Sequence, residues 1–229
     1  MSFSSDVKAE LTRQCSKSRH CQLAELAGML ELEGTLSGEE QADAKGSVLT
    51  LSSDNELLTE KFHTLIRKAF GFDASAGLSE AQSEEVLRTL RWNTVADREE
   101  LLEMQRADGL LVQRTCCRRA FIRGAFMAAG SISDPNKSYH FEIVCHTMEQ
   151  AKQLQKLIDS FDADAKIVER KERYVLYLKE GSQIVDMLNV MEAYVALMQL
   201  ENVRILKEMR NSVNRKVNCE TANINKTVN

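Results

Sequence analysis

The chain has 229 residues, of which 43% are hydrophobic and 28% are charged, with ten glycines and a single proline. This composition is typical of a globular protein and excludes collagen-like, proline-rich and low-complexity chains. No run of about 18 apolar residues predicts a transmembrane helix, and the polar N-terminus lacks the apolar stretch of a secretory signal. We therefore expect a cytoplasmic protein that makes no contact with a membrane.

The formal net charge of −4 argues against a simple basic nucleic-acid binder, but the charge is unevenly distributed along the chain. The first 110 residues hold 12 Lys and Arg against 20 Asp and Glu, whereas the last 26 hold six against two. A terminal basic segment is often a solvated surface, and it is also where contacts with polyanions are commonly made.

Residues 23–34 and 120–130 are two similar segments with the composition and the periodicity of helices. They read LAELAGMLELEG and AFIRGAFMAAG, and each has an internal glycine that is followed by a second glycine six residues later. A glycine inside a helix lowers helix stability by about 1 kcal/mol relative to alanine, so a glycine at the same position in both helices needs a physical reason. We predict that the two helices pack with their backbones in close approach. The positions at this contact are Ala27, Gly28, Gly124 and Ala125.

The residues after the first helix predict an extended piece, a strand, a helix, two more strands and a further helix. The helix that begins at Asp54 has apolar side chains at a period of 3.6 and ends at Gly71. Apolar and β-branched clusters predict the strands. The remaining predicted elements are a strand at 47–52, strands at 72–78 and 85–92, and a helix from 93 to about 104.

The residues after the second helix repeat this order. Thr147 is a predicted N-cap, because Glu149 and Gln150 follow it before an apolar helical pattern. The asparagine-rich residues 218–229 have no periodicity, so we expect them to be disordered or ordered only by a partner. The predicted elements are strands at 139–146, 164–170 and 173–178, a helix at 182–190, and a helix from 191 to about 214.

The repeated order predicts an α+β fold built from two pseudo-symmetric αββαββα halves. Each half supplies the partner that the other needs, so we expect a monomer with internal pseudo-twofold symmetry. The predicted division is a first half at 1–104, a linker at 105–115, a second half at 116–203, and a basic helix and tail at 204–229.

Six cysteines are present, but no export signal supports disulfide bonds. A zinc site could be assembled from Cys116, Cys117, Cys145 and His146. Zinc ligands are usually separated by two to four residues, and adjacent residues on a helix point about 100° apart. We therefore expect buried free thiols, no metal and no cofactor. The other histidines, including His20, accompany no nucleophile and are interpreted as structural or surface residues.

Several stretches carry a resemblance to known families. LAGMLELEG (residues 26–34) is similar to the LAGLIDADG motif of homing endonucleases, and IRGAFMAAG (residues 122–130) resembles a degenerate second copy. Four longer stretches resemble the WhiA family of bacterial regulators, which are tied to sporulation, cell division and chromosome segregation. These stretches are SFSSDVKAELTR, CCRRAFIRGAFMAAGSISDPNKSYHFEI, ERKERYVLYLKEG and VRILKEMRNSVNRKVNCETANINKTVN.

The resemblance implies that the antiparallel sheets form a saddle with the helices on one face, and that double-stranded DNA is a partner. It also implies a transcription regulator associated with the nucleoid. A helix-turn-helix domain would follow residue 229 and read most of the DNA sequence. We therefore expect this chain to be a shortened form of such a regulator.

The resemblance also implies where catalytic metals would bind. In LAGLIDADG nucleases, the acidic residue before each terminal glycine holds divalent cations at the scissile phosphates. The corresponding residues are Glu33 and Ala129, and alanine can neither ligate a metal nor act as a base. Asp134, in the following turn, is poorly placed to replace it. We expect Glu33 and Ala129 to be vestigial positions and the protein not to be an enzyme.

The implied DNA contacts fall on the strands of the second half and on the basic C-terminal helix. Lys166 and Arg170 share one face of their strand, and Arg173 shares a face with Tyr177 on the next strand. A solvated sheet or helix face would show the same pattern. The basic residues of the C-terminal helix recur at helical spacing and are Arg204, Lys207, Arg210, Arg215 and Lys216.

Two other functions fit the same sequence. One is a working metal-dependent endonuclease, in which Glu33 would still support cleavage. The other is a protein-interaction module with an unidentified protein partner and no contact with DNA.

Overall fold

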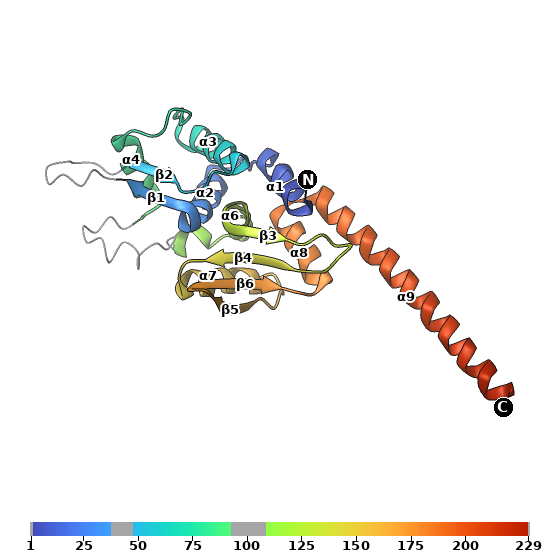
Figure 1. The fold of residues 1–229 in the computed structure, drawn as a ribbon. Helices are drawn as coiled ribbons and strands as arrows, with labels where there is room; N and C mark the ends of the chain where they lie inside the picture. Colours follow the sequence, from blue (N-terminus) through green and yellow to red (C-terminus); the bar gives the residue numbers. More distant parts are fainter. Residues whose placement is uncertain (1, 38–47, 93–108, 229) are drawn as a thin grey trace.

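The structure is a computed structural model that describes residues 2–37, 48–92 and 109–228 (Figure 1). It has the packed helices and antiparallel sheets of an α+β fold. The helices are α1 (Phe3–Arg13), α2 (Arg19–Glu33), α3 (Glu56–Phe70), α4 (Glu80–Thr89), the short 3₁₀ helix η1 (Gly109–Val112), α6 (Thr115–Ala129), α7 (Met148–Asp159), α8 (Gly181–Met191) and α9 (Tyr194–Val228). The strands are β1 (Gly34–Ser37), β2 (Val48–Leu51), β3 (Gly130–Ile132), β4 (Phe141–Cys145), β5 (Lys166–Arg170) and β6 (Arg173–Leu178).

Helices α2 and α6 pack directly against each other at the centre of the molecule (Figure 1). A Cβ atom added to Gly28 would overlap the backbone carbonyl oxygen of Phe121, and one added to Gly124 would overlap that of Glu25. The two contacts are related by the same offset of 96 residues, so the pair has pseudo-twofold symmetry. Any larger residue at either glycine would force the two helix backbones apart.

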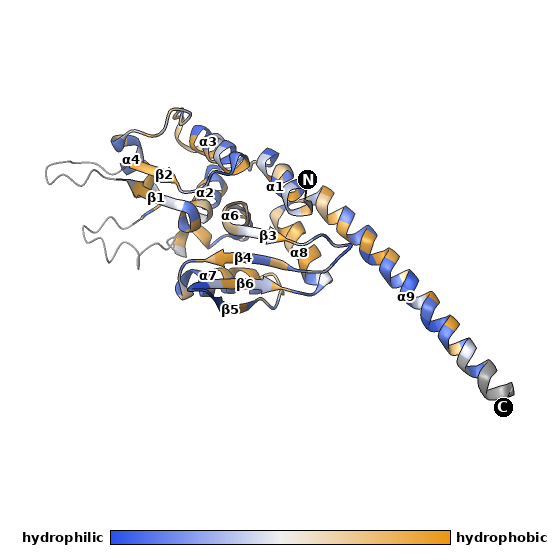
Figure 2. Ribbon diagram, in the orientation of Figure 1, coloured by the Kyte–Doolittle hydropathy of each residue, from blue (hydrophilic) through white to orange (hydrophobic). Residues whose placement is uncertain are grey.

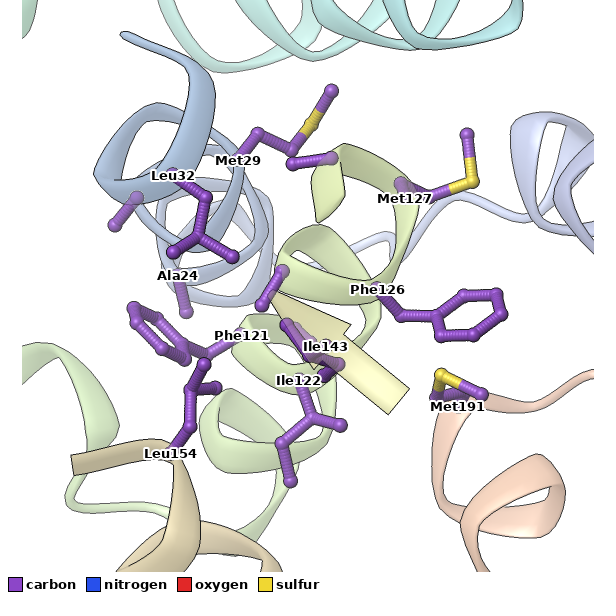
Figure 3. Close-up of a cluster of buried hydrophobic side chains, with 14 of the residues drawn as sticks. Ala24, Met29, Leu32, Phe121, Ile122, Phe126, Met127, Ile143, Leu154 and Met191 are labelled. Atoms are coloured by element: carbon purple, nitrogen blue, oxygen red, sulfur yellow. The ribbon is translucent and has the colours of Figure 1, made fainter. Parts of the chain in front are cut away.

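The helix pair lies inside one hydrophobic core that both halves share. Every residue from Cys21 to Leu32 in α2 is buried, so this helix has no solvent-exposed face over three turns. Figure 3 shows side chains of α2 and α6 packed together with Ile143 of β4, Leu154 of α7 and Met191 of α8. Residues from both ends of the chain therefore stabilise the same helix contact.

The second half contains a four-stranded antiparallel sheet in the order β3-β4-β6-β5. One face packs on α6 and α7 and buries alternate residues such as Phe141, Ile143 and Leu176. The other face carries the intervening residues and is open to solvent. Thr147 and Gln150 form the capping box that the sequence predicts for α7. The strands predicted at 139–146, 164–170 and 173–178 and the helix at 182–190 are confirmed with boundaries shifted by at most two residues, whereas the helix predicted from 191 to about 214 runs from Tyr194 to Val228.

The first half differs from its prediction, because the strands expected at 72–78 and 85–92 are wrong. Helix α4 occupies most of the second range and begins at a capping box formed by Ser79 and Gln82. A short apolar run fits a helical period as well as an alternating one, and here the cap selects the helix. The first range contains a turn and no strand. Within the described residues, this half therefore has only the two-stranded sheet β1–β2, and the expected symmetry of the two sheets is incomplete.

Three further differences concern the rest of the chain. Helix α1 has no counterpart among the predicted elements. The helix expected from 93 to about 104, and part of the linker expected at 105–115, lie outside the described residues. The disorder expected for 218–229 is wrong, because α9 continues to Val228 with no glycine or proline to interrupt it. None of the described helices has both the length and the apolarity needed to cross a bilayer.

A buried network of charged side chains joins five helices around the central pair. Glu25 of α2 is fully buried and forms ion pairs of 2.9 Å with Lys61 of α3 and with Arg123 of α6. Arg123 also forms a 2.9 Å ion pair with Glu192 at the end of α8, and Lys61 donates a 2.9 Å hydrogen bond to the carbonyl oxygen of Leu11 in α1. Each buried charge thus has an opposite charge beside it, as the low-dielectric interior requires.

Replacing Gly124 by alanine should destabilise the protein, although alanine is the better helix former. The added methyl group overlaps backbone of α2, so we expect the free energy of unfolding to fall by at least about 2 kcal/mol. Gly109→Ala is the matched control, because its Cβ would meet open space. Denaturant unfolding followed by circular dichroism measures both changes. Equal stability of the two variants would contradict the close approach.

Replacing Glu25 by glutamine should cost about 3–5 kcal/mol, because Lys61 and Arg123 would lose the carboxylate that they share. Asp164→Asn removes the exposed partner of Lys166 and should change the free energy of unfolding by less than about 0.5 kcal/mol. Thermal and denaturant unfolding of the two variants compare a buried with an exposed ion pair. A Glu25 variant as stable as the Asp164 variant would show that the network contributes nothing.

Candidate nucleic-acid interface

The C-terminal ends of α2 and α6 lie where the resemblance to nucleases places the metal-binding acids. Glu33 is the last residue of α2, and its Oε2 atom accepts a 2.9 Å hydrogen bond from the hydroxyl of Ser52 after β2. Ala129 is the last residue of α6 and offers only a methyl group. In the parts of the chain that the structure describes, no group of three or more metal-ligating side chains includes Glu33.

A cation of the protein itself acts electrostatically on this carboxylate. The Lys8 ammonium of α1 is partly buried and lies 5.9 Å from the centre of the Phe126 ring. Burial lowers the pKa of Lys8, and the charge of Glu33 opposes this shift. A single carboxylate is a poor site for the divalent cations that hydrolyse two phosphodiester bonds, because each cation needs several oxygen ligands.

The exposed face of the four-stranded sheet brings together the basic residues that the sequence singled out on its strands. Lys166 pairs in register with Tyr177, and Arg170 pairs with Arg173 across the β5–β6 turn. The same face includes Lys179, whose Nζ lies 5.1 Å from the centre of the Tyr177 ring. A shallow hollow of about 210 Å³ is lined by Arg170, Tyr177 and Lys179, together with His140 and Glu142. Cationic and aromatic groups thus share one surface that none of the described helices covers.

Sequence reasoning missed part of this surface. Lys179 comes two residues after Tyr177, so it lies on the same face as Arg173 and Tyr177. Extending the alternation past the predicted end of this strand would have identified it. His140 shares this face with Glu142, as the alternation in the predicted strand indicates; its ring stacks on Tyr177 at 6.0 Å, and its Nε2 lies 2.9 Å from Oε2 of Glu142. Burial opposes ionisation of Glu142, but hydrogen bonds from His140 and Ser131 outweigh it and lower the pKa of this carboxyl group.

Two of the basic residues on the strands also have partners within the protein. Lys166 forms a 2.6 Å ion pair with Asp164, which raises the pKa of the lysine. The guanidinium group of Arg173 contacts the imidazole of His146. Both contacts are at the surface, so a phosphate could replace Asp164 or His146 as the partner with little loss of free energy.

The predicted basic residues of α9 fall into two groups. Arg204 forms a 3.0 Å ion pair with Glu201, and Lys207 donates a 2.6 Å hydrogen bond to the carbonyl oxygen of Pro135. Lys207 also lies 4.7 Å from the centre of the Tyr139 ring, so this residue joins α9 to the segment between β3 and β4. The others are exposed where α9 extends away from the body (Figure 1) and are Arg210, Arg215 and Lys216.

Apolar side chains share the exposed part of α9 with these basic residues. Figure 2 shows polar and apolar residues alternating along the helix. The exposed apolar residues are Tyr194, Val195, Met198, Ile205, Leu206, Met209, Val213 and Val217. A helix with this pattern can bury its apolar side against another protein surface.

The cysteines considered as a zinc set do not form one group. Cys116 and Cys117 begin α6 and lie beside His20 and Cys21 of α2, whereas neither Cys145 nor His146 belongs to a described group of three metal-ligating side chains. Burial raises the pKa of Cys145 to about 12, with a further contribution from the charge of Glu31, so this thiol is protonated at neutral pH. Burial and the neighbouring thiols likewise raise the pKa of Cys21 to about 12.

Comparison with known proteins identifies the family. The family profile described as "WhiA LAGLIDADG-like domain" matches residues 118–210. The probable cell division protein WhiA of Lachnoclostridium phytofermentans is 47% identical over 243 residues, which cover the whole of this chain and 77% of that protein. The chain belongs to the WhiA family. A second WhiA relative, from Lachnospira eligens, is 44% identical and is covered to 75% of its length.

Solved structures show the same fold. Full-length WhiA from Thermotoga maritima superposes with a TM-score of 0.64 at 20% identity, over the whole of this chain and 75% of that chain. A structure of mesophilic variants of the homing endonuclease I-DmoI superposes with a TM-score of 0.53 at 13% identity, over 76% of this chain and 96% of that chain. The WhiA family therefore shares the LAGLIDADG fold with a nuclease, as the motif resemblance implied.

Proposed function

We propose that this chain is a DNA-binding regulatory scaffold of the WhiA type, which contacts duplex DNA without cleaving it. The observation that carries the proposal is the exposed sheet face, where side chains from neighbouring strands present positive charge around an aromatic centre. Its cations are Lys166, Arg170, Arg173 and Lys179. Nucleic-acid affinity depends mainly on such clustered cations, each of which can neutralise one phosphate.

The register of the sheet explains why these charges favour an anionic ligand. Arg170 and Arg173 are paired directly across the β5–β6 ladder, and like charges in this position repel each other. The turn between them consists of Lys171 and Glu172, both with positive φ, so the hairpin is tight and the two arginines cannot move apart along the strands. A phosphate between the guanidinium groups would convert the repulsion into two charge-assisted contacts.

Two further observations support DNA as the ligand and argue against cleavage. I-DmoI, which has the same fold, has been solved in complex with its target DNA in the presence of magnesium, with a TM-score of 0.52 to this chain. The acidic position of α2 is retained as Glu33, whereas that of α6 is Ala129. We infer that the fold keeps the surface for DNA and lacks the second carboxylate for hydrolysis.

A second candidate function is a protein-interaction module without DNA contact. The exposed apolar residues of α9 favour it, because they offer a partner an amphipathic helix. The internal pairing of α2 with α6 supports a monomer for either function, since each half supplies the partner that the other needs.

Reversing charge on the sheet face should weaken DNA binding. We expect the double change Arg170→Glu and Lys179→Glu to lower the affinity for a duplex about tenfold or more at low salt, and to reduce the slope of log K against log salt by about 2. The control is Lys152→Glu with Lys156→Glu, which alters the net charge equally on exposed positions of α7, behind the sheet. Fluorescence anisotropy over a salt series measures both.

Equal losses in the two double variants would show that net charge alone determines binding and would contradict a specific sheet surface. Absence of binding by the unchanged chain at low salt would favour the protein-interaction module instead.

The chain should leave supercoiled plasmid intact in the presence of magnesium or manganese, because only Glu33 of the two acidic positions is retained. Agarose electrophoresis of the plasmid tests this directly. Nicking that disappears in Glu33→Gln, but persists in the exposed control Glu149→Gln, would establish the endonuclease function and overturn the proposal.

A further inference from the structure

The N-terminal ends of the central helices bring together four side chains that the proposed function does not use. His20 and Cys21 lie in the first turn of α2, and Cys116 and Cys117 lie in the first turn of α6. One possible ligand atom from each of the four lies within 4.8 Å of the others. The His20 Nδ1 atom is 3.3 Å from Sγ of Cys21 and 3.3 Å from Sγ of Cys117.

The pseudo-twofold symmetry of the helix pair accounts for this arrangement. His20 corresponds to Cys116 and Cys21 to Cys117 at the same offset of 96 residues that relates the two contact glycines. Adjacent residues on one helix point in different directions, so one pair alone could not surround an ion. Two such pairs from closely packed helices approach the same point from opposite sides.

Three thiols and one imidazole are ligands that zinc prefers, in a tetrahedral arrangement. With Zn–S distances of about 2.3 Å and Zn–N distances of about 2.0 Å, the ligand atoms around zinc lie about 3.5–3.8 Å apart. The separations in this cluster, 3.3 Å for two pairs and at most 4.8 Å for the rest, lie on both sides of these values. Side-chain adjustments of about 1 Å would therefore complete the coordination.

We propose that His20, Cys21, Cys116 and Cys117 bind one structural zinc ion that joins the N-terminal turns of α2 and α6. The four protein ligands leave no open position for substrate, so the ion stabilises the helix pair and takes no part in catalysis. Cys21 and Cys117 are buried, whereas Cys116 is exposed and provides the route by which the ion enters.

The surroundings can compensate the charge of the occupied site. Binding releases the thiol protons to solvent and leaves three thiolates around a divalent cation, a net charge of −1. Both ligand pairs lie at helix N-termini, where partial positive charge stabilises thiolates. Arg114, the N-cap residue of α6, adds a full positive charge beside them.

The metal content of the purified chain tests the proposal. The chain is prepared under reducing conditions without chelator, and zinc is measured by native mass spectrometry and by elemental analysis. We expect about one zinc ion per chain and its loss in Cys116→Ser, which changes an exposed residue and should still fold. Cys219→Ser, at an exposed cysteine of α9, is the matched control and should keep the ion.

Two measurements on the same proteins complete the test. Replacement of zinc by cobalt should give the absorption spectrum of tetrahedral thiolate coordination in the unchanged chain and in Cys219→Ser, but not in Cys116→Ser. A strong chelator should lower the thermal midpoint of the unchanged chain and leave that of Cys116→Ser unaltered.

Three results would overturn the proposal. The first is a metal-free chain that does not take up added zinc. The second is zinc retained equally in Cys116→Ser and Cys219→Ser. The third is a mass lower by two hydrogens with a disulfide mapped between Cys21 and Cys116 or Cys117, which would make the cluster a redox pair.

Discussion

The close approach of the α2 and α6 backbones at Gly28 and Gly124 is the constraint on which the rest of the structure depends. Because neither position tolerates a side chain, the backbones of α2 and α6 meet there, and both ends of the two helices are brought together in pairs. Glu33 and Ala129 are the last residues of the two helices, and the N-terminal ends place His20 and Cys21 near Cys116 and Cys117. One packing contact thus creates two locations where metal chemistry is geometrically possible.

The two locations differ in the side chains that occupy them. At the C-terminal ends, the two positions hold one carboxylate, Glu33, and the methyl group of Ala129. At the N-terminal ends, four nitrogen and sulfur donors come together, of which Cys21 and Cys117 also belong to the hydrophobic core. In this chain the close helix pair is present, while only one of the two acidic positions of a LAGLIDADG nuclease holds an acidic residue.

The halves around the helix pair have also diverged, and this concentrates the proposed DNA surface in one of them. The second half has a complete four-stranded sheet with a basic outer face, whereas the described part of the first half has two strands and the additional helix α4. The two halves are nevertheless joined by the buried carboxylate of Glu25, because its ion pairs with Lys61 and Arg123 connect α3 of the first half with α6 of the second. A scaffold that binds DNA mainly through one half needs such a rigid connection to the other.

Local signals in the sequence were enough for most of the fold. The repeated glycines identified the helix contact, and the cap at Thr147 and the alternation in β6 predicted their elements correctly. The segment around Val86 was predicted wrongly because a short apolar run fits both periods, and only the cap at Ser79, some residues before it, distinguishes them.

The candidate sites were harder to predict because they depend on residues far apart in the chain. Nothing near Glu25 in sequence indicates that Lys61 and Arg123 neutralise it, and the donors of the thiol cluster lie on separate helices. The sequence suggested Cys145 and His146 as the neighbours of Cys116 and Cys117, whereas the packing of α2 on α6 brings His20 and Cys21 to them. The basic residues on the sheet were found by alternation, and their contact with DNA stays a prediction.

If the close approach at the glycines unites the two halves into one cooperative unit, amide hydrogen exchange of the native protein should show it. Amides in the middle of α2 and of α6 should exchange last, together, and with one common opening free energy close to that of global unfolding. Exchange of either helix through a markedly smaller opening, while the other stays protected, would contradict it.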